Sequence, residues 1–127
     1  MSTMTEARSD VSANGEVRPT AILVRPDGIE HYHGPLELEP LQAMVEGLVQ
    51  VIDVKLDKLP EASMWLNEEG KYLGLVPNPI GTGLLAKAGG FPGDIVVGNV
   101  VITGTPDVTG KTQPVDDAWL AEFPESA

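Results

Sequence analysis

The chain has no cysteine and few basic residues. Its 127 residues include 8 Lys and Arg against 19 Asp and Glu, a formal net charge of −11. Without cysteine the protein forms no disulfide, uses no thiolate nucleophile and builds no zinc–thiolate site. The shortage of Lys and Arg argues against direct nucleic-acid binding, because contacts to phosphates need clustered basic side chains.

Long apolar runs are also missing from the sequence. A membrane-spanning helix needs about 20 consecutive apolar residues, and no segment approaches that length. The polar stretch from Met1 to Val17 lacks the apolar centre of a secretory signal. These absences predict a soluble, cytoplasmic protein that has no membrane partner.

The apolar residues that are present, 42% of the chain, are enough to build one folded core. A chain of 127 residues fits a single domain. Residues 1–18 are polar and predict a disordered N-terminal tail. We expect residues 19–123 to form the domain and residues 124–127 to form a C-terminal tail.

Periodicity predicts the elements of the first half of the chain. The short β-branched run 20–25 and the turn Pro26-Asp27-Gly28 predict a β-hairpin, with residues 29–33 returning as its second strand. A helix follows, because Leu38, Leu41, Met44, Val45 and Leu48 share one helical face. Gly47 is a natural stop for this helix. Residues 48–56 then alternate with the period of two that is typical of a strand.

The middle of the chain carries weaker signals. Two short apolar runs, 64–67 and 71–75, flank Glu68-Glu69-Gly70 and predict a second hairpin. Beyond it, a short helix is expected over residues 82–88, with Thr82 as its N-cap.

The last third predicts one buried strand and one helix. Residues 94–103 are nearly all apolar, which favours a central strand, and Gly98-Asn99 indicates a bulge or a tight turn within it. Residues 116–123 predict a final helix with Asp116 as N-cap. The predicted fold class is therefore α+β: a mostly antiparallel sheet of five to seven strands, one main packed helix and short additional helices.

His31 and His33 are the candidate metal ligands. They stand two residues apart on one face of a predicted strand, and such a pair binds a divalent metal when a carboxylate joins it. Glu30 points to the opposite face, and no distant acid is singled out. The favoured alternative is a pair of solvated histidines on an edge strand, with Tyr32 packed inward.

The glycine-rich segment 78–93 is a candidate ligand site. Gly81, Thr82 and Gly83 place backbone amides near a helix start, where a phosphate or carboxylate binds, and Lys87 could assist. A single Gly-x-Gly is nonspecific, so the alternative interpretation is a turn that requires positive φ.

Signals for catalysis are weak. Gly104–Thr112 resembles a phosphate loop, but its first glycine stands one residue too far away and Pro114 disfavours the helix that must follow. The carboxylate pairs Glu68/Glu69 and Asp116/Asp117 are adjacent in sequence, so their members do not converge on one substrate. The chain also lacks a Gly-x-Ser-x-Gly nucleophile motif. We expect no enzymatic activity and no cofactor.

Acidic residues are concentrated in one stretch of the chain. Between Pro26 and Val54 there is no Lys or Arg, and six acids occur: Asp27, Glu30, Glu37, Glu39, Glu46 and Asp53. A surface of one sign can steer a basic partner toward the protein, or it can simply maintain solubility.

Three groups of residues carry a resemblance to a known family. They are Leu41-Gln42, Val45 and Gly47 before a strand; Asn67-Glu68-Glu69-Gly70-Lys71 with Gly74-Leu75 and Asn78; and Gly93-Asp94-Ile95 with Gly98, Val100-Val101 and Gly104. Over residues 20–123 the chain resembles a small domain family of unknown function that is common in phages, plasmids and conjugative elements, notably of actinobacteria. The resemblance implies a mobile-element setting and a short stand-alone protein, and it brings no established activity.

Asn67, Asn78 and Asp94 are the polar residues of this shared pattern. Each fits a structural role, as turn former, helix-start bond or acceptor of a backbone amide, and each also fits a ligand contact. The function expected from the sequence is that of a non-catalytic accessory protein of a phage or mobile element, acting in the host cytoplasm. It would bind a host protein or other partner through its acidic surface. The alternative is a small-ligand-binding or sequestering protein that uses segment 78–93; an oligomer is compatible with both.

Overall fold

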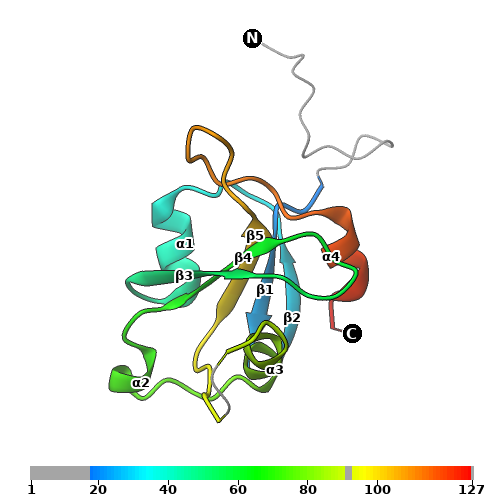
Figure 1. Cartoon of the computed structure of the whole chain (residues 1–127). Helices are drawn as coiled ribbons and strands as arrows, with labels where there is room; N and C mark the ends of the chain where they lie inside the picture. Colours follow the sequence, from blue (N-terminus) through cyan, green and yellow to red (C-terminus); the bar gives the residue numbers. More distant parts are fainter. Residues whose placement is uncertain (1–17, 91–92, 127) are drawn as a thin grey trace.

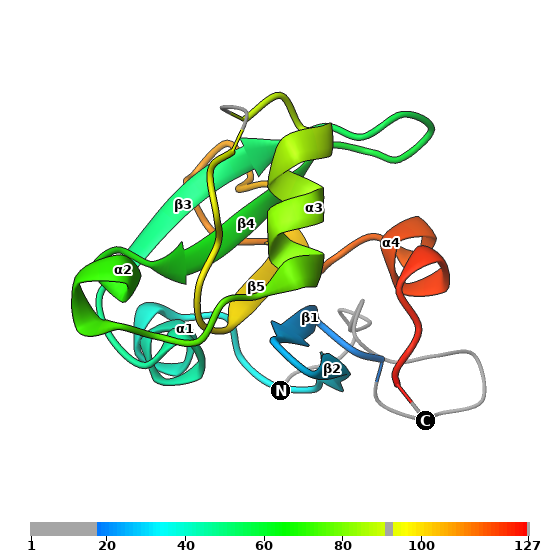
Figure 2. The ribbon, with the colours of Figure 1, turned by 90° about the horizontal axis from the view of Figure 1, so that it is seen from below.

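The computed structural model describes residues 18–90 and 93–126 and shows one antiparallel sheet with helices on both faces (Figure 1 and Figure 2). The elements are β1 (Ala21–Arg25), β2 (Gly28–Tyr32), α1 (Leu38–Val45), β3 (Val49–Val54), β4 (Ala62–Asn67), α2 (Gly70–Leu73), α3 (Pro79–Lys87), β5 (Val100–Gly104) and α4 (Asp117–Glu122). The sheet has five strands in the order β2-β1-β5-β4-β3, and every neighbouring pair is antiparallel. The predicted α+β class is confirmed.

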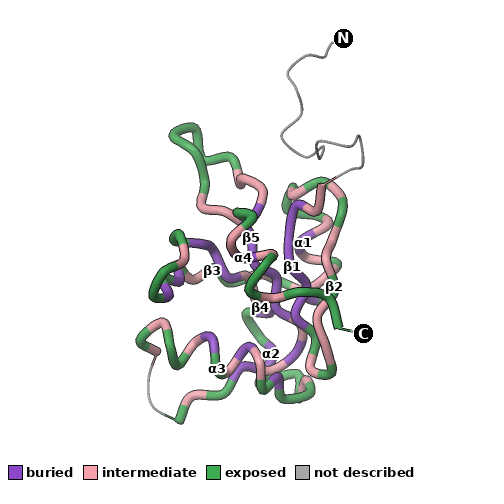
Figure 3. The backbone as a smooth tube through the Cα atoms, turned by 90° about the vertical axis from the view of Figure 1, so that its right-hand side faces the viewer, coloured by how far each residue is buried: buried purple, intermediate pink, exposed green. Residues whose placement is uncertain are grey.

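Each face of the sheet buries its own apolar cluster. On one face α1 contributes Leu41 and Val45, which pack with Leu23 of β1 and Val101 of β5. The other face holds the larger cluster, where α3 and α4 cover the sheet and Trp119 is fully buried. Figure 3 shows buried positions along the central strands, and β1, β4 and β5 have four buried residues each. None of the helices in residues 18–90 and 93–126 has the length and apolar character that crossing a bilayer requires.

The first hairpin, the main helix, the strand after it and the last helix all form where the periodicity predicts them. The main helix ends because Glu46 adopts a left-handed backbone (φ 66°), and its N–H and that of Gly47 bond back to carbonyls of α1. At the other end of the chain, Asp116 caps α4 by accepting the N–H of Ala118 at 2.8 Å.

The predicted second hairpin is wrong. After β4 ends at Asn67, the chain forms the single helical turn α2 instead of a returning strand. In this turn Gly70 packs closely against a distant segment, because a Cβ there would lie 2.8 Å from Cγ2 of Val97. Gly74 then ends α2 with φ 72°, a conformation that glycine tolerates best. The contact with Val97 comes from a distant segment, so a local pattern could not reveal it.

The predicted strand over residues 94–103 is too long. Only its C-terminal part lies in β5, and Val97 makes just an isolated bridge with Pro77. Gly98 has φ 78° and turns the chain between that bridge and β5. The predicted break at Gly98-Asn99 is therefore real, and it ends the regular sheet pairing on its N-terminal side.

The predicted helix over residues 82–88 begins too late. The structure has α3 starting at Pro79, and the N-cap is Asn78 rather than Thr82. Oδ1 of Asn78 accepts the N–H of Gly81 at 2.9 Å. Pro79 suits the first helical position because proline has no N–H, and an N–H at that position would have no partner within the helix.

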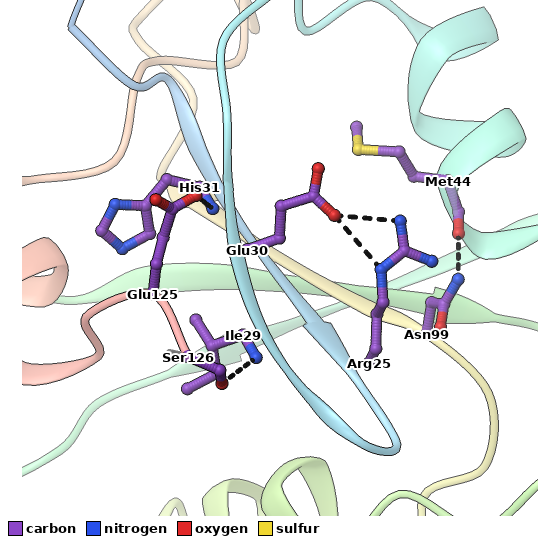
Figure 4. Close-up of polar contacts among 8 residues, drawn as sticks. All are labelled: Arg25, Ile29, Glu30, His31, Met44, Asn99, Glu125 and Ser126. Atoms are coloured by element: carbon purple, nitrogen blue, oxygen red, sulfur yellow. Dashed lines mark hydrogen bonds and ion pairs between the residues drawn. The ribbon is translucent and has the colours of Figure 1, made fainter.

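The outer edge of β2 is covered by the C-terminal segment. Ser126 donates its N–H to the carbonyl oxygen of Ile29 and accepts the N–H of Ile29 at its hydroxyl, at 2.9 and 2.8 Å. The carboxylate of Glu125 accepts the N–H of His31 at 2.9 Å (Figure 4). Residues that we expected to form a tail thus seal one edge of the sheet. The predicted N-terminal tail lies outside the described residues, except for Arg18.

Candidate functional site

A groove of about 620 Å³ lies between α2, the sheet face of β3 and β4, and residues 94–97. Its floor includes Gln50 and Ile52 from β3 and Leu66 from β4. Lys71 and Tyr72 of α2 line one wall. The groove exists because the chain turns into α2 after β4, so that a helical turn stands beside the sheet where a strand would have extended it.

One ion pair crosses this groove. Nζ of Lys71 lies 2.6 Å from Oδ1 of Asp94, and the same oxygen accepts the N–H of Ile95 at 3.0 Å. The hydrogen bond from Lys71, followed by its charge, lowers the pKa of the Asp94 carboxyl below its ordinary value. Asp94 is therefore ionised at neutral pH and already paired.

Two further carboxylates line the groove. Glu68 and Glu69 are both exposed, and neither makes an ion pair with another described residue. Lys71 is the only base among the groove-lining residues, and it is held by Asp94. The groove thus has an uncompensated negative charge that favours a cationic group from a partner.

Large apolar side chains stand exposed beside the groove. They form what we call the apolar rim: Tyr72 (90% exposed), Leu73 (52%), Val76 (63%) and Ile95 (50%). Tyr72 and Ile95 line the groove itself, and Val76 is tied to the segment opposite because its carbonyl accepts the N–H of Gly98. Several exposed large apolar side chains next to a hollow are characteristic of binding surfaces.

The site residues predicted from the sequence do not converge on one place. Asn67 and Asp94 line the groove, whereas Lys87 lines a separate hollow near Leu59 and Phe123. The residues predicted at the start of the helix, Asn78, Gly81, Thr82 and Gly83, line neither of these hollows.

The amide of Asn67 is used inside the fold. Its Nδ2 donates to the carbonyl oxygens of Val45 and Glu46, at 3.0 and 3.2 Å, and its Oδ1 accepts the N–H of Glu69 at 2.7 Å. The side chain is only 4% exposed. Asn67 therefore ties the end of α1 to the turn that leads into α2, and it positions the groove wall.

Both polar atoms of the Asn78 side chain also make hydrogen bonds within the fold. It is fully buried, donates from Nδ2 to the carbonyl oxygens of Val24 and Gly98, and accepts the N–H of Gly81. These contacts connect the start of α3 to β1 and to the turn before β5. The structural interpretation of both asparagines is thus supported by specific bonds.

Two backbone amides at the start of α3, those of Gly81 and Thr82, are already occupied. The N–H of Gly81 is bonded to Oδ1 of Asn78, and the N–H of Thr82 to the carbonyl oxygen of Asn78 at 2.9 Å. The hydroxyl of Thr82 accepts the N–H of Val96 at 2.9 Å. Gly83 faces open space. Nothing in this geometry adds support for the predicted anion contact.

His31 and His33 lie at the β2 edge. Nε2 of His31 is 2.8 Å from the carbonyl oxygen of Phe123, and His33 is exposed. Tyr32 packs inward as predicted, and burial followed by the charge of Glu37 raises the pKa of its phenol. Within residues 18–90 and 93–126, no three His, Asp or Glu side chains group so as to hold a metal ion.

The six acids between Pro26 and Val54 are all exposed but belong to different parts of the fold. Glu30 pairs with Arg25 across the first hairpin at 3.0 Å (Figure 4). Glu39 lies in the first turn of α1, Glu46 caps its end, and Asp53 is on β3. The negative charge of this stretch is thus distributed over several elements of the fold.

The sheet, its two helical layers and the groove define a small single-sheet α+β domain. Residues 18–126 match the model of DUF3846, a domain of unknown function, and the chain belongs to that family. The expectation of an uncharacterised family is thereby confirmed. No curated protein and no solved structure gives a significant match.

Sequence reasoning missed the apolar rim. Tyr72, Leu73 and Ile95 stand in runs that predicted buried strands, and apolar residues in such runs normally point into a core. One sequence signal spoke against a returning strand: Gly74-Leu75 is followed by two prolines, Pro77 and Pro79, and proline is uncommon inside strands.

Proposed function

We propose that the protein is a non-catalytic accessory protein of a phage or mobile element that binds a protein partner at the groove and its apolar rim. The observation that carries this proposal is the position of Tyr72, which is 90% exposed and lines the groove. The mobile-element setting rests on the sequence resemblance alone.

The chemistry of the surface indicates the kind of partner. Tyrosine is among the residues that contribute most to protein interfaces, because its ring buries much area with little loss of conformational freedom. The carboxylates of Glu68 and Glu69 favour Lys or Arg beside this aromatic contact, and the net charge of −11 steers a basic partner toward the protein. The expected partner surface is therefore an apolar residue flanked by basic side chains.

A non-catalytic role agrees with how the groove uses its polar groups. Asp94 is paired with Lys71, and the amide of Asn67 is bonded to backbone groups. General acid–base catalysis needs groups whose pKa values are poised near the working pH. The pKa of the Asp94 carboxyl, which Lys71 lowers, is displaced away from neutrality.

Site-specific crosslinking tests this proposal. A photoreactive phenylalanine analogue replaces Tyr72 in one variant and Val108 in a control, because Val108 is fully exposed in the loop after β5. Expressed in host cells, the variant at 72 should give a discrete protein adduct that the control lacks. Adding Glu68→Lys and Glu69→Lys should reduce that adduct. Equal adducts from positions 72 and 108 would overturn the proposal.

The small-ligand alternative predicts a different observation. Protein purified from host cells and examined by native mass spectrometry would carry a discrete added mass that disappears on unfolding. The same sample without added mass, together with a crosslink confined to position 72, would favour the protein partner.

A further inference from the structure

The strand β3 leaves one edge of the sheet open. It is the last strand in the order β2-β1-β5-β4-β3, and among the residues that the structure describes it pairs only with β4. The bond from Glu68 N–H to the carbonyl oxygen of Leu48 continues this ladder by one step. Because hydrogen-bonded pairs alternate along an antiparallel ladder, Gln50, Ile52 and Val54 bond to β4, and the backbone groups of Val49, Val51 and Asp53 point outward. No segment within residues 18–90 and 93–126 bonds to these outward groups.

The two edges of the sheet therefore differ in how their outward backbone groups are hydrogen-bonded. On β2, Glu125 and Ser126 bond the N–H groups of His31 and Ile29 (Figure 4), and Ser126 also bonds the carbonyl of Ile29, while β3 lies at the outer side of the sheet away from that segment (Figure 2). A protein with two open edges could add strands without limit and form fibres. With a single open edge, pairing between two copies satisfies both edges and stops at a closed dimer.

The sequence of β3 has little of the usual protection of an exposed edge. It reads Val-Gln-Val-Ile-Asp-Val, with no proline, lysine or glycine. Asp53 is its single charge, and Val51 is 50% exposed. Natural edge strands that remain unpaired normally carry an inward charge, a proline or a bulge.

A two-fold axis through Val51 suits this strand. In that register Val51 opposes Val51 of the second copy, and Val49 of each copy opposes Asp53 of the other. Each of these opposed pairs then exchanges two backbone N–H to C=O hydrogen bonds, as hydrogen-bonded pairs of an antiparallel ladder do. The two Asp53 carboxylates stand at opposite ends of the new ladder, about 14 Å apart along the strands, so their repulsion is small.

We propose that the protein forms a homodimer in which β3 pairs antiparallel with β3 of a second copy, joining two five-stranded sheets into one. This inference rests on the open edge and is independent of the proposed partner at the groove. The proposed dimer has one consequence for the groove. Gln50 and Ile52 line the groove floor, and in the proposed register each opposes the other across the axis, so the two floors become continuous.

The experiment measures mass and amide exchange on the full chain. Sedimentation equilibrium from about 10 µM to about 1 mM should show a reversible monomer–dimer equilibrium, the range expected for a small interface. Because both copies are acidic, the dissociation constant should fall as salt is raised. In parallel, the amides of Val49, Val51 and Asp53 should exchange rapidly in dilute protein and become protected on concentration, while Gln50 and Ile52 stay protected throughout.

Charge variants at position 51 identify the interface. Val51→Lys and Val51→Glu each place like charges against each other across the axis, and each should raise the dissociation constant by more than about tenfold. Mixing the two variants should restore dimers, because opposite charges then meet. Val108→Lys, at a fully exposed site in another loop, should dimerise like the unmodified protein.

Three results would overturn the proposal. One is a monomeric mass at the highest concentration. Another is a dimer that Val51→Lys leaves intact. The last is a dimer in which the amides of Val49, Val51 and Asp53 still exchange as in the dilute sample, since the copies would then meet at another surface.

Discussion

The side chain of Asn78, at the start of α3, donates a hydrogen bond of 3.0 Å to the carbonyl oxygen of Val24 in β1. The same Nδ2 donates to Gly98, at 2.8 Å, in the turn that leads into β5. One buried amide therefore fixes a helix start against two separate parts of the chain. This arrangement explains why a polar residue can be fully buried here at no net cost, since both its donors and its acceptor are used.

Replacing Asn78 should strongly destabilise the fold. Asn78→Ala removes three hydrogen bonds and leaves the buried carbonyls of Val24 and Gly98 without this donor, so we expect a loss of about 2–4 kcal/mol in the free energy of unfolding. Urea denaturation followed by tryptophan fluorescence measures this loss. The control is Asn99→Ala, which removes a single bond to Met44 (Figure 4) and should cost about 1 kcal/mol. Equal losses in the two variants would contradict this account.

Two glycines of α3 should respond in opposite ways to the same substitution. Gly83→Ala adds a methyl group where nothing lies within 4 Å, so the helix propensity of alanine should stabilise the protein by about 0.5–1 kcal/mol. Gly81→Ala places its Cβ 3.1 Å from methyl carbons of Val96 and Val100, a crowding that should cancel the gain or reverse its sign. Thermal unfolding of both variants gives the comparison, and a stabilised Gly81→Ala would show that the core yields more easily than these distances imply.

Elements whose signals are local could be predicted from the sequence. The turn Pro26-Asp27-Gly28 determines the first hairpin, and the spacing from Leu38 to Leu48 determines α1. In both cases the residues that decide the structure are neighbours along the chain or within one helical turn. The asparagines of the family pattern were also recognised, with their structural role as one of two alternatives.

Elements decided by distant contacts could not be predicted. Residues 71–75 have the apolar composition of a strand, but Gly70 packs against Val97 and the chain coils into α2. The groove and its apolar rim depend on that turn, for which the prolines after Gly74-Leu75 were the one local signal in the sequence. The start of α3 is a different case, because Asn78 followed by Pro79 is a local capping signal that could have been preferred over Thr82.

The C-terminal segment should control the β2 edge. Glu125→Ala combined with Ser126→Ala removes the side chains that accept the N–H groups of His31 and Ile29. We expect these two amides to exchange faster by about fivefold or more, because each loses a bond worth about 1 kcal/mol. The amide of Leu23, in the buried strand β1 between two neighbours, serves as the internal control. Unchanged exchange at Ile29 would mean that the segment does not seal the edge in solution.

The ion pair between Lys71 and Asp94 should give the groove a defined acid response. The hydrogen bond from Lys71 lowers the pKa of Asp94 below its ordinary value of 3.8, so in the folded protein this carboxyl stays ionised to lower pH than in the unfolded chain. A carboxyl of lowered pKa contributes stability that is present above its unfolded pKa and is lost as the pH falls through its folded pKa. Lys71→Met should therefore raise the pKa of Asp94 toward 3.8 and make stability less dependent on pH in the acid range.

Carbon-detected NMR titration of the side-chain carboxyls measures this change. Asp107 provides an internal control in the same spectra, because the pKa of its carboxyl is lowered chiefly by the hydroxyl of Thr109 and has no contribution from Lys71. In Lys71→Met the titration of Asp107 should stay unchanged while that of Asp94 moves upward. If both carboxyls shift together, the substitution acts through a change in the whole fold. If neither moves, the ion pair does not persist in solution and the groove carries one more free acid for a basic partner.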